Sequence, residues 1–343
     1  MKLELGYLAS QEQYSPSELL RFAQLAAKVG FQSIWTSDHF HPWIHTKSQS
    51  GFAWTWLGAL GATTNAVKFG TGVTCPLFRY NPAIVAQAFA TMDSMFPGRV
   101  FLGVGTGEAL NEVPMGYTWP EMSERRERLI EAIKIIKLLW SGNRVNFDGE
   151  YYKMKKASLY TRPKSKIPLY VAASGPKMAE VAGIYSDGLL TLPFDDKYIK
   201  DQLLAPFDDG ARKAGRDPSL LPRLAEVWIS YHRDYDKALK SCRFWAATLL
   251  PFMFTAAIYD PKEIEQYSGY VSDEAIAKSW CIATSPEDQI RCAERFIRLG
   301  FSDLHFSSSS PNEEEFIRVC GTKVLPYLKN TYGEPKHKKG THG

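Results

Sequence analysis

Two segments of the chain combine side chains that could carry out acid–base chemistry. The first, DHFHPWIH at residues 38–45, contains three histidines, whose imidazole groups titrate near neutrality and can exchange a proton with an alcohol or a carbonyl group. A metal site is the alternative, but no acidic or cysteine partner has the spacing of a ligand set, so we predict no metal. We interpret His41 and His45 as surface or hydrogen-bonded core residues, and we favour a functional role for Asp38 and His39.

The second segment, GVGTGEALNE at residues 103–112, combines glycines with carboxyl groups. Glycine at alternate positions lets the backbone approach a planar ligand or a phosphate closely. The third glycine follows the second too soon for the dinucleotide-binding motif G-x-G-x-x-G, so that motif is not met. An ordinary turn between strand and helix is the alternative. Such a turn does not require Glu108, and a buried carboxyl group can have a raised pKa and donate a proton.

Two further segments give weaker signals. Cys75 lies beside a proline in TGVTCPL at residues 71–77, but no base is recognisable near it, so a nucleophilic thiol is the less favoured interpretation. SGPKM at residues 174–178 begins a helical pattern, and the amino terminus of a helix can hold a phosphate group, especially next to Lys177. The alternative for this segment is again an ordinary turn.

These segments share one place in the expected fold, because each follows a short apolar run typical of a strand. We expect eight strands at residues 3–8, 33–37, 68–73, 100–105, 169–173, 188–192, 227–231 and 303–307. Helical patterns separate most of them, which favours a mainly parallel sheet covered by helices. Eight such units in 343 residues favour a closed α/β TIM barrel over an open sheet. Catalytic groups of such a barrel lie at the carboxyl ends of its strands, where these segments fall.

The expected helices have recognisable ends. Residues 15–30 and 285–300 each begin with a capping sequence, SPSE or SPED, and end in glycine. Residues 122–140 form a long amphipathic helix.

We expect one barrel domain over residues 1–328 and a basic flexible tail at residues 329–343. A hairpin insertion is predicted near residues 143–166, where strand-like runs flank a DG turn. A helical cap is predicted near residues 243–282, where aromatic and apolar residues interrupt the alternation of strands and helices.

Composition excludes several classes of protein. With 45% apolar and 23% charged residues, the chain can bury a large core and is neither disordered nor fibrous. The net charge of +4 is too small and too scattered for a nucleic-acid-binding surface. No apolar run approaches the ~18 residues that span a bilayer, and the amino terminus leads into a strand pattern without a targeting peptide. We therefore expect no nucleic-acid or membrane partner.

The cysteines indicate a reducing compartment. The chain has five, with no C-x-x-C pair, at positions Cys75, Cys242, Cys281, Cys292 and Cys320. An odd and widely spaced set without a secretory signal predicts reduced thiols in a cytoplasmic protein.

At these residues the chain resembles the deazaflavin-dependent branch of the bacterial luciferase-like superfamily. The similarity runs from Gly6 to about Leu325. It is most specific at SDHF (37–40) with Trp43, FRYNPA (78–83) continuing to QAFAT (87–91), residues 103–112, and RFWA (243–246). The resemblance implies a TIM barrel with insertions, usually a homodimer, that binds coenzyme F420. FMN is the less favoured cofactor.

The same resemblance implies residue roles. Side chains matching His39, Trp43 and Glu108 flank the reactive face of the deazaflavin in that branch. A non-prolyl cis peptide is expected between Gly72 and Val73, behind the ring. The cofactor is expected to lie along Asp38, Gly72, Val73, Cys75, Thr106, Gly107, Asn111, Ser174, Gly175, Lys177 and Met178.

Two groups within this branch compete on the substrate side: glucose-6-phosphate dehydrogenases and secondary alcohol dehydrogenases, both F420-dependent. The sugar-phosphate enzymes hold the phosphate with a threonine, two lysines and an arginine, but ungapped alignment places Leu192, Asp195, Thr255 and Ser279 there. Each lost charge-assisted hydrogen bond costs ~1.5–3 kcal/mol, so a phosphate dianion would bind poorly. The pocket is also expected to contain Trp228, Phe252 and Phe254, which suits a small alcohol or ketone.

We therefore predict hydride transfer between a small secondary alcohol and the deazaflavin. His39 is the expected base, Trp43 the hydrogen-bond donor to the substrate oxygen, and Glu108 a proton carrier. A sugar-phosphate dehydrogenase is the first alternative, because a register shift onto Lys197 would restore one cation. The others are a methylene-tetrahydromethanopterin reductase, a flavin monooxygenase and a non-catalytic carrier of the deazaflavin.

Overall fold

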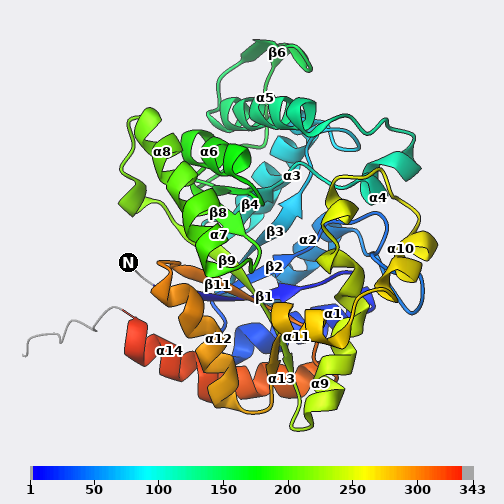
Figure 1. Ribbon diagram of the computed structural model, residues 1–343. Helices are drawn as coiled ribbons and strands as arrows, with labels where there is room; N and C mark the ends of the chain where they lie inside the picture. Colours follow the sequence, from blue (N-terminus) through cyan, green and yellow to red (C-terminus); the bar gives the residue numbers. More distant parts are fainter. Residues whose placement is uncertain (1–2, 334–343) are drawn as a thin grey trace, which may run out of the picture.

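The computed structural model describes residues 3–333, which contain a closed barrel of eight parallel strands surrounded by helices (Figure 1). The barrel strands are β1 (Glu4–Ala9), β2 (Ser33–Thr36), β3 (Lys68–Thr74), β4 (Val100–Val104), β7 (Leu169–Ala172), β8 (Gly188–Thr191), β9 (Arg223–Tyr231) and β11 (Asp303–Ser308). They pair in that order, and the pairing of β11 with β1 closes the ring. The eight expected strands and the TIM-barrel fold are confirmed.

The barrel wall separates two apolar regions. On β9, Ala225 and Val227 belong to the large core between the strands and the helices. Leu224 belongs instead to a smaller cluster with Trp35 of β2 and Phe101 of β4, whose ring centroids are 4.1 Å apart. Successive side chains of a strand point to opposite faces, so the even-numbered residues of β9 face the barrel interior.

The helices begin where capping sequences predict. α1 (Pro16–Val29) and α12 (Pro286–Arg298) each have a complete capping box, and α5 (Met122–Trp140) has the predicted bounds. The other helices are α2 (Ala53–Thr63), α3 (Pro82–Met95), α4 (Ala109–Glu112), α6 (Pro176–Tyr185), α7 (Asp196–Tyr198), α8 (Ala205–Lys213), α9 (Tyr235–Ser241), α13 (Glu313–Val319) and α14 (Leu325–Tyr332).

A further strand, β10 (Cys281–Ala283), is not among the eight expected, because three residues give too short a pattern. It pairs with Ile229–Tyr231 at the end of β9, whereas β8 pairs with Arg223–Ala225 at the start of β9. Between these two pairings, residues 226–228 have no strand partner on this side within residues 3–333. On this side, the strand paired with β9 therefore changes from β8 to β10 near the middle of β9.

Both predicted insertions are present. β5 (Val145–Asp148) and β6 (Lys153–Ala157) form an antiparallel hairpin that lies over α5 in Figure 1. The cap consists of short helices, which are η4 (Cys242–Leu249), η5 (Pro251–Phe254), α10 (Pro261–Ser268) and α11 (Asp273–Ser279). 

The carboxyl-terminal helix extends into the segment predicted to be a tail. α14 reaches Tyr332, and Lys329 Nζ donates to the carbonyl oxygen of Gly30 at 2.6 Å. Residues 329–332 are therefore helical and not part of a flexible tail. The rest of the predicted tail, residues 334–343, lies outside the described residues.

One pair of cysteines corrects the expectation of five reduced thiols. Cys281 of β10 and Cys292 of α12 form a disulfide, with their Cα atoms 6.3 Å apart. Because a helix that follows a strand packs back onto it, two cysteines 11 residues apart come within disulfide reach. Cys75, Cys242 and Cys320 are free and buried.

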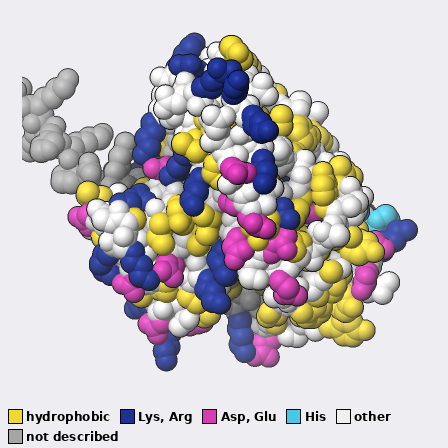
Figure 2. Space-filling view, turned by 90° about the horizontal axis from the view of Figure 1, so that it is seen from above, with side chains coloured by type: hydrophobic (Ala, Val, Ile, Leu, Met, Phe, Trp, Pro, Cys, Tyr) yellow, Lys and Arg dark blue, Asp and Glu magenta, His cyan; other side chains and the backbone are white. Residues whose placement is uncertain are grey.

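Within residues 3–333, no helix has the length and apolarity needed to cross a membrane, and no three His, Cys, Asp or Glu side chains gather as a metal site. Figure 2 looks down on the molecule from the hairpin side, and basic, acidic and apolar side chains are intermixed over this face.

Candidate active site at the barrel mouth

The candidate residues follow the carboxyl ends of neighbouring strands. His39 follows β2, Cys75 follows β3 and Thr106 follows β4. The cap packs against this end of the barrel, because Trp43 and Leu110 share an apolar cluster with cap residues. Catalytic groups of TIM barrels lie at this end.

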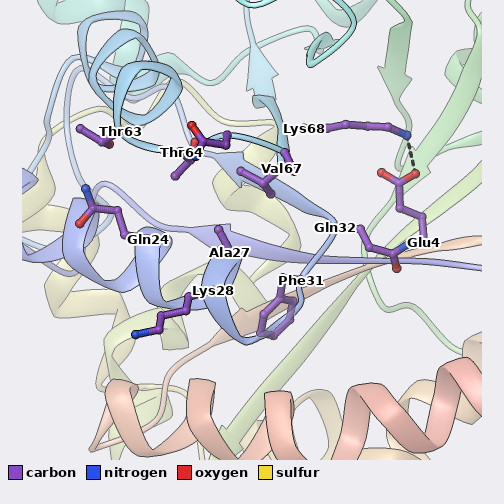
Figure 3. Close-up of a pocket in the computed structure, with 12 residues that line it drawn as sticks. Glu4, Gln24, Ala27, Lys28, Phe31, Gln32, Thr63, Thr64, Val67 and Lys68 are labelled. Carbon is purple, nitrogen blue, oxygen red and sulfur yellow. Dashed lines mark hydrogen bonds and ion pairs between the residues drawn. The ribbon is translucent and has the colours of Figure 1, made fainter.

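A groove of about 520 Å³ lies at the other end of the barrel (Figure 3). Glu4 and Lys68, the first residues of β1 and β3, line it and form an ion pair at 2.6 Å. The groove lies at the amino ends of the strands, so it is not the candidate site for the reaction.

His39 lies against a buried carboxylate. Its Nδ1 is 3.4 Å from Oε1 of Glu12, whose side chain is only 1% exposed. The other oxygen of Glu12 accepts a hydrogen bond from Ser37 Oγ at 2.7 Å, and Ser50 Oγ donates to the carbonyl oxygen of His39 at 2.7 Å. His39 Nδ1 has no hydrogen-bond partner among the described residues, so the Glu12 carboxylate acts on the imidazole through its charge alone, and Nε2 is the nitrogen that we assign to proton exchange.

Trp43 lies between His39 and the cap. Its ring centroid is 5.9 Å from that of His39 and 5.4 Å from that of Phe254 in η5. The residue is 5% exposed. The indole therefore borders both the candidate base and the apolar cap.

Glu108 immediately precedes α4, in extended backbone conformation. Asn111 Nδ2 donates to Glu108 Oε2 at 3.1 Å, and Asn111 Oδ1 accepts from the backbone N–H of Phe40 at 2.8 Å. Asn111 is 2% exposed. Because both ends of its amide are used within the protein, Asn111 links the loop of His39 to the loop of Glu108.

A buried ion-pair network joins the same two loops. Arg79 Nη2 is 3.1 Å from Asp38 Oδ1, and Arg79 Nη1 is 3.3 Å from Glu112 Oε1. Tyr80 and Thr74 hydroxyl groups also donate to the Asp38 carboxylate, at 3.0 and 2.6 Å. Both oxygens of Asp38 are thus occupied by protein donors.

Burial and charge act in opposite directions in this network. Burial alone would lower the pKa of Arg79, but the carboxylates of Asp38 and Glu112 raise it above its ordinary value. Burial raises the pKa of Glu112, although Arg79 lowers it. The guanidinium charge is therefore held firmly between its two partners.

The backbone near Cys75 confirms one expectation and weighs against another. The peptide between Gly72 and Val73 is cis, as expected. Burial, together with the nearby Glu112 carboxylate, raises the pKa of the Cys75 thiol, which opposes the thiolate that a nucleophile needs. A Cβ on Gly107 would lie 2.5 Å from Cys75 Sγ, and Gly107 has φ +76°. This turn requires glycine.

The start of α6 could hold an anion. Gly175 precedes the helix without a side-chain cap, so the first backbone N–H groups are available, and Ser174 and Lys177 are exposed there. Tyr198 donates its hydroxyl to the carbonyl oxygen of Ser174 at 2.8 Å. Met178 is 8% exposed and packs in the main core, so only its backbone can face a ligand.

The positions aligned with phosphate-binding residues use their polar atoms locally. Asp195 is exposed and caps α7, accepting from the backbone N–H of Tyr198 at 2.9 Å. Ser279 Oγ donates to the carbonyl oxygen of Ala275 at 3.0 Å, and Thr255 Oγ1 points to the carbonyl of its own helix η5. Leu192 is half-buried. None of these four side chains carries a positive charge.

The predicted aromatic pocket is assembled in part. Phe254 packs against Trp43, and the Trp228 ring stacks on Trp280 with centroids 5.4 Å apart. Trp245 belongs to both clusters and connects them. Phe252 is 40% exposed and packs edge-on against Tyr267 of α10, not against Trp43.

Sequence reasoning assigned no role to three residues of this site. Glu12 follows β1, so a search after every strand end would have found it. Arg79 stands in the FRYNPA stretch, but its partners are distant in sequence. Trp280 precedes β10, the strand that no pattern indicated, and its indole nitrogen is buried without a hydrogen-bond partner in the part of the chain that the structure describes.

Comparison with known proteins gives the following relatives. Residues 3–296 match the family model described as luciferase-like monooxygenase. The chain is 44% identical over 331 residues to the F420-dependent glucose-6-phosphate dehydrogenase of Microbacterium testaceum, covering 96% of this chain and 98% of that protein. The protein of the same name from Nakamurella multipartita is 40% identical, with 97% and 98% covered.

Solved structures give a second group of relatives. An F420-dependent secondary alcohol dehydrogenase in complex with an F420–acetone adduct has a TM-score of 0.93 at 43% identity, with 96% of this chain and 99% of that chain covered. The coenzyme F420-dependent tetrahydromethanopterin reductase of Methanopyrus kandleri has a TM-score of 0.80 at 22% identity, covering 96% and 100%, and shares the fold.

Proposed function

The chain belongs to the luciferase-like monooxygenase family, and on that premise we propose that it is an F420-dependent dehydrogenase of small secondary alcohols. Overall similarity supports F420 but does not choose the substrate, because the relatives named for glucose 6-phosphate and for secondary alcohol are 44% and 43% identical. The choice depends on the residues around the substrate.

The described residues fit a flat, anionic deazaflavin. The turn at Gly107 offers bare backbone to a planar ring, since a side chain there would collide with Cys75. The uncapped start of α6, with Lys177 exposed, suits a phosphate. When bound, F420 would supply an acceptor for two electrons as hydride. The protein's part is to bind, orient and move protons.

The proton steps can be assigned to side chains of this chain. His39 Nε2 takes the hydroxyl proton of the alcohol, while the negative charge of Glu12 lies 3.4 Å from Nδ1. Trp43 donates its indole N–H to the substrate oxygen and stabilises the charge that develops there. Glu108, held by Asn111 at 3.1 Å, would donate the proton that the cofactor takes up when it accepts the hydride.

The observation that carries the choice of an alcohol is the character of the cap over Trp43. Aromatic rings cover this side, and Thr255 and Ser279 use their hydroxyl groups on nearby carbonyl oxygens. Asp195 would repel a phosphate rather than bind it. A neutral substrate with one oxygen and short apolar arms matches such a surface.

The direct test is an assay of the purified protein with F420, followed by loss of absorbance of the oxidised cofactor. We expect turnover with 2-propanol and at least a hundredfold lower kcat/KM with glucose 6-phosphate, since two or more charge-assisted bonds of about 1.5–3 kcal/mol each are missing. The reverse preference would establish the sugar-phosphate alternative. The absorption spectrum of bound cofactor distinguishes F420 from FMN.

We also propose a homodimer. Support comes from α2, whose exposed residues Thr55, Ala59, Ala62 and Thr63 carry no charge, and from Phe52 and Ile84, each 51% exposed near the starts of α2 and α3. Light scattering after size exclusion should give twice the mass of the 38.7 kDa chain. 

A cytoplasmic location is part of the same proposal. The disulfide between Cys281 and Cys292 is the feature that could contradict it, since cytoplasmic thiols are mostly reduced. Alkylation of cells before lysis, followed by mass spectrometry, reports whether this pair is oxidised in place.

A further inference from the structure

Glu226 places an unassigned carboxyl group at the floor of the barrel mouth. It lies two residues beyond Leu224 on the same face of β9, one layer nearer the carboxyl ends of the strands. Burial raises the pKa of Glu226, yet the residue keeps accessible surface. His305 lowers and Glu12 raises the pKa of this carboxyl group through their charges, and both effects are smaller than that of burial.

The carboxyl group has one specific partner. Trp228 Nε1 donates to Glu226 Oε2 at 2.9 Å, and the Trp228 ring stacks on Trp280 at an interplanar angle of 25°. Trp280 contributes no hydrogen bond to this arrangement, because its own indole nitrogen is unpartnered. The orientation of Trp228 about the stack therefore depends on Glu226.

The position of Glu226 and Trp228 in the barrel wall explains why the Trp228 side chain needs a hydrogen bond to fix its orientation. Glu226 and Trp228 lie on the stretch of β9 between the β8 pairing and the β10 pairing, where no strand supports this edge. The cap fills that side, and Trp228 shares a cluster with Trp245, which also packs with the cluster of Trp43. Trp228 thus lies next to the cap, where this edge of β9 has no strand neighbour among the described residues.

We propose that Glu226 is a specificity-determining residue, which positions the Trp228 indole as the side wall of the alcohol pocket and so limits the length of alcohol that fits. The inference rests on the proposed function for its choice of substrate. The structural half of the inference is that the orientation of Trp228 depends on Glu226, and this half does not rest on the proposed function.

The test compares Glu226→Gln with Glu226→Leu in the full-length protein loaded with F420. The amide oxygen of glutamine can accept the indole N–H, so Glu226→Gln should keep the wild-type preference. Leucine has a similar size but no acceptor, and it should raise KM for 2-propanol by about tenfold, the equivalent of one lost hydrogen bond to a charged group. KM for 2-heptanol should change less, and kcat should stay within about twofold, because the proton-transfer groups are untouched.

A spectroscopic measurement separates positioning from general damage. Two stacked indoles give an exciton couplet in circular dichroism, which Trp280→Phe identifies by removing it. The couplet should persist in Glu226→Gln and weaken in Glu226→Leu. F420 affinity, measured by quenching of its fluorescence, should be the same in both variants. Should Glu226→Leu fail to fold, Trp228→Phe keeps an aromatic ring without the N–H and should show the same change in alcohol preference.

Several outcomes would overturn the inference. If Glu226→Leu keeps both the exciton couplet and the wild-type alcohol preference, then Glu226 does not position Trp228. A wild-type alcohol preference in Trp228→Phe would lead to the same conclusion. A loss of kcat in Glu226→Gln as large as in Glu226→Leu would make it a proton-transfer group instead. If the wild-type protein oxidises no alcohol, the proposed function fails, and the couplet still decides the structural half.

Discussion

The reaction side and the substrate side of this barrel mouth are held together in different ways. The reaction side carries His39 and Glu108 on loops that Arg79 and Asn111 join through buried charges and hydrogen bonds. The substrate side consists of aromatic rings on short helices and on β9, where the indole N–H of Trp228 donates a hydrogen bond to Glu226.

The difference indicates which side can change in evolution. A buried ion pair is costly to break singly, because the remaining charge is left unpaired, so the reaction side resists substitution. Apolar contacts tolerate exchange of one side chain for another of similar volume. Relatives named for different substrates at almost equal identity fit this division, with one chemistry and an exchangeable cap.

The largest expected effect is on the reaction side. Replacing His39 by alanine should lower kcat by about three orders of magnitude, within the range for loss of a general base, and leave F420 affinity nearly unchanged. Steady-state kinetics and fluorescence titration measure the two quantities. His45→Ala, in the same loop but exposed, is the matched control and should retain activity. A parallel loss of affinity and turnover would remove the role assigned to His39.

Next in size is the effect of breaking the network of Arg79. Arg79→Met should lower the free energy of unfolding by about 3–4 kcal/mol, because Asp38 and Glu112 are left buried without their cation. Urea unfolding measures it. Arg318 and Glu314 form an exposed ion pair on α13, so Arg318→Met is the control and should cost under about 1 kcal/mol. Equal losses in the two variants would mean that the reaction side is not specially cross-linked.

The same contrast governs what could be predicted from sequence. His39 and Glu108 follow strand ends closely, and neighbouring strands of a barrel bring such loops together, so their place in the fold was accessible from the pattern. The role expected for Trp43, and the grouping of the three residues around a cofactor, came from the family resemblance. The capping sequences SPSE and SPED likewise determined the starts of α1 and α12. These are local signals.

Contacts between distant segments left no such signal. The partners of Arg79 lie 41 and 33 residues away, and Trp228 meets Trp280 only because β10 extends the wall beside β9. Phe252 was predicted for the pocket from its type, but the direction of a side chain in a short irregular helix is not encoded in a simple period. The disulfide was missed because β10, the strand of Cys281, is too short to give a pattern.

A smaller effect concerns Glu313, which belongs to neither side and could confuse pH measurements. Its carboxyl group accepts from Tyr7 and Ser308, and burial raises its pKa to about 7. A folded pKa above the unfolded value of an acid favours the protonated native state. The contribution to stability is therefore complete below about pH 4.5 and is lost as the pH rises through about 7.

Glu313→Gln should remove this dependence. Between pH 4.5 and 7.5, the wild-type free energy of unfolding should fall by roughly 3 kcal/mol more than that of the variant, as measured by urea unfolding at each pH. The pH profile of kcat should be the same in both proteins, which would assign the kinetic titration to the reaction side. A kinetic profile that moves with Glu313→Gln would contradict the separation.

The smallest expected effect tests whether the substrate side is exchangeable. Thr255→Lys combined with Ser279→Arg places cations at two positions that now carry hydroxyl groups. We expect kcat/KM for glucose 6-phosphate to rise by about tenfold, since one well-formed charge-assisted bond is worth about 1.5–3 kcal/mol and two exposed cations will form it imperfectly. Thr255→Ala with Ser279→Ala is the matched control, and it should gain nothing. A change confined to an independent cap would leave His39, Trp43 and Glu108 able to act on 2-propanol. If the cationic variant instead loses both alcohol oxidation and F420 affinity, and gains no sugar-phosphate activity, then the cap and the reaction side are coupled.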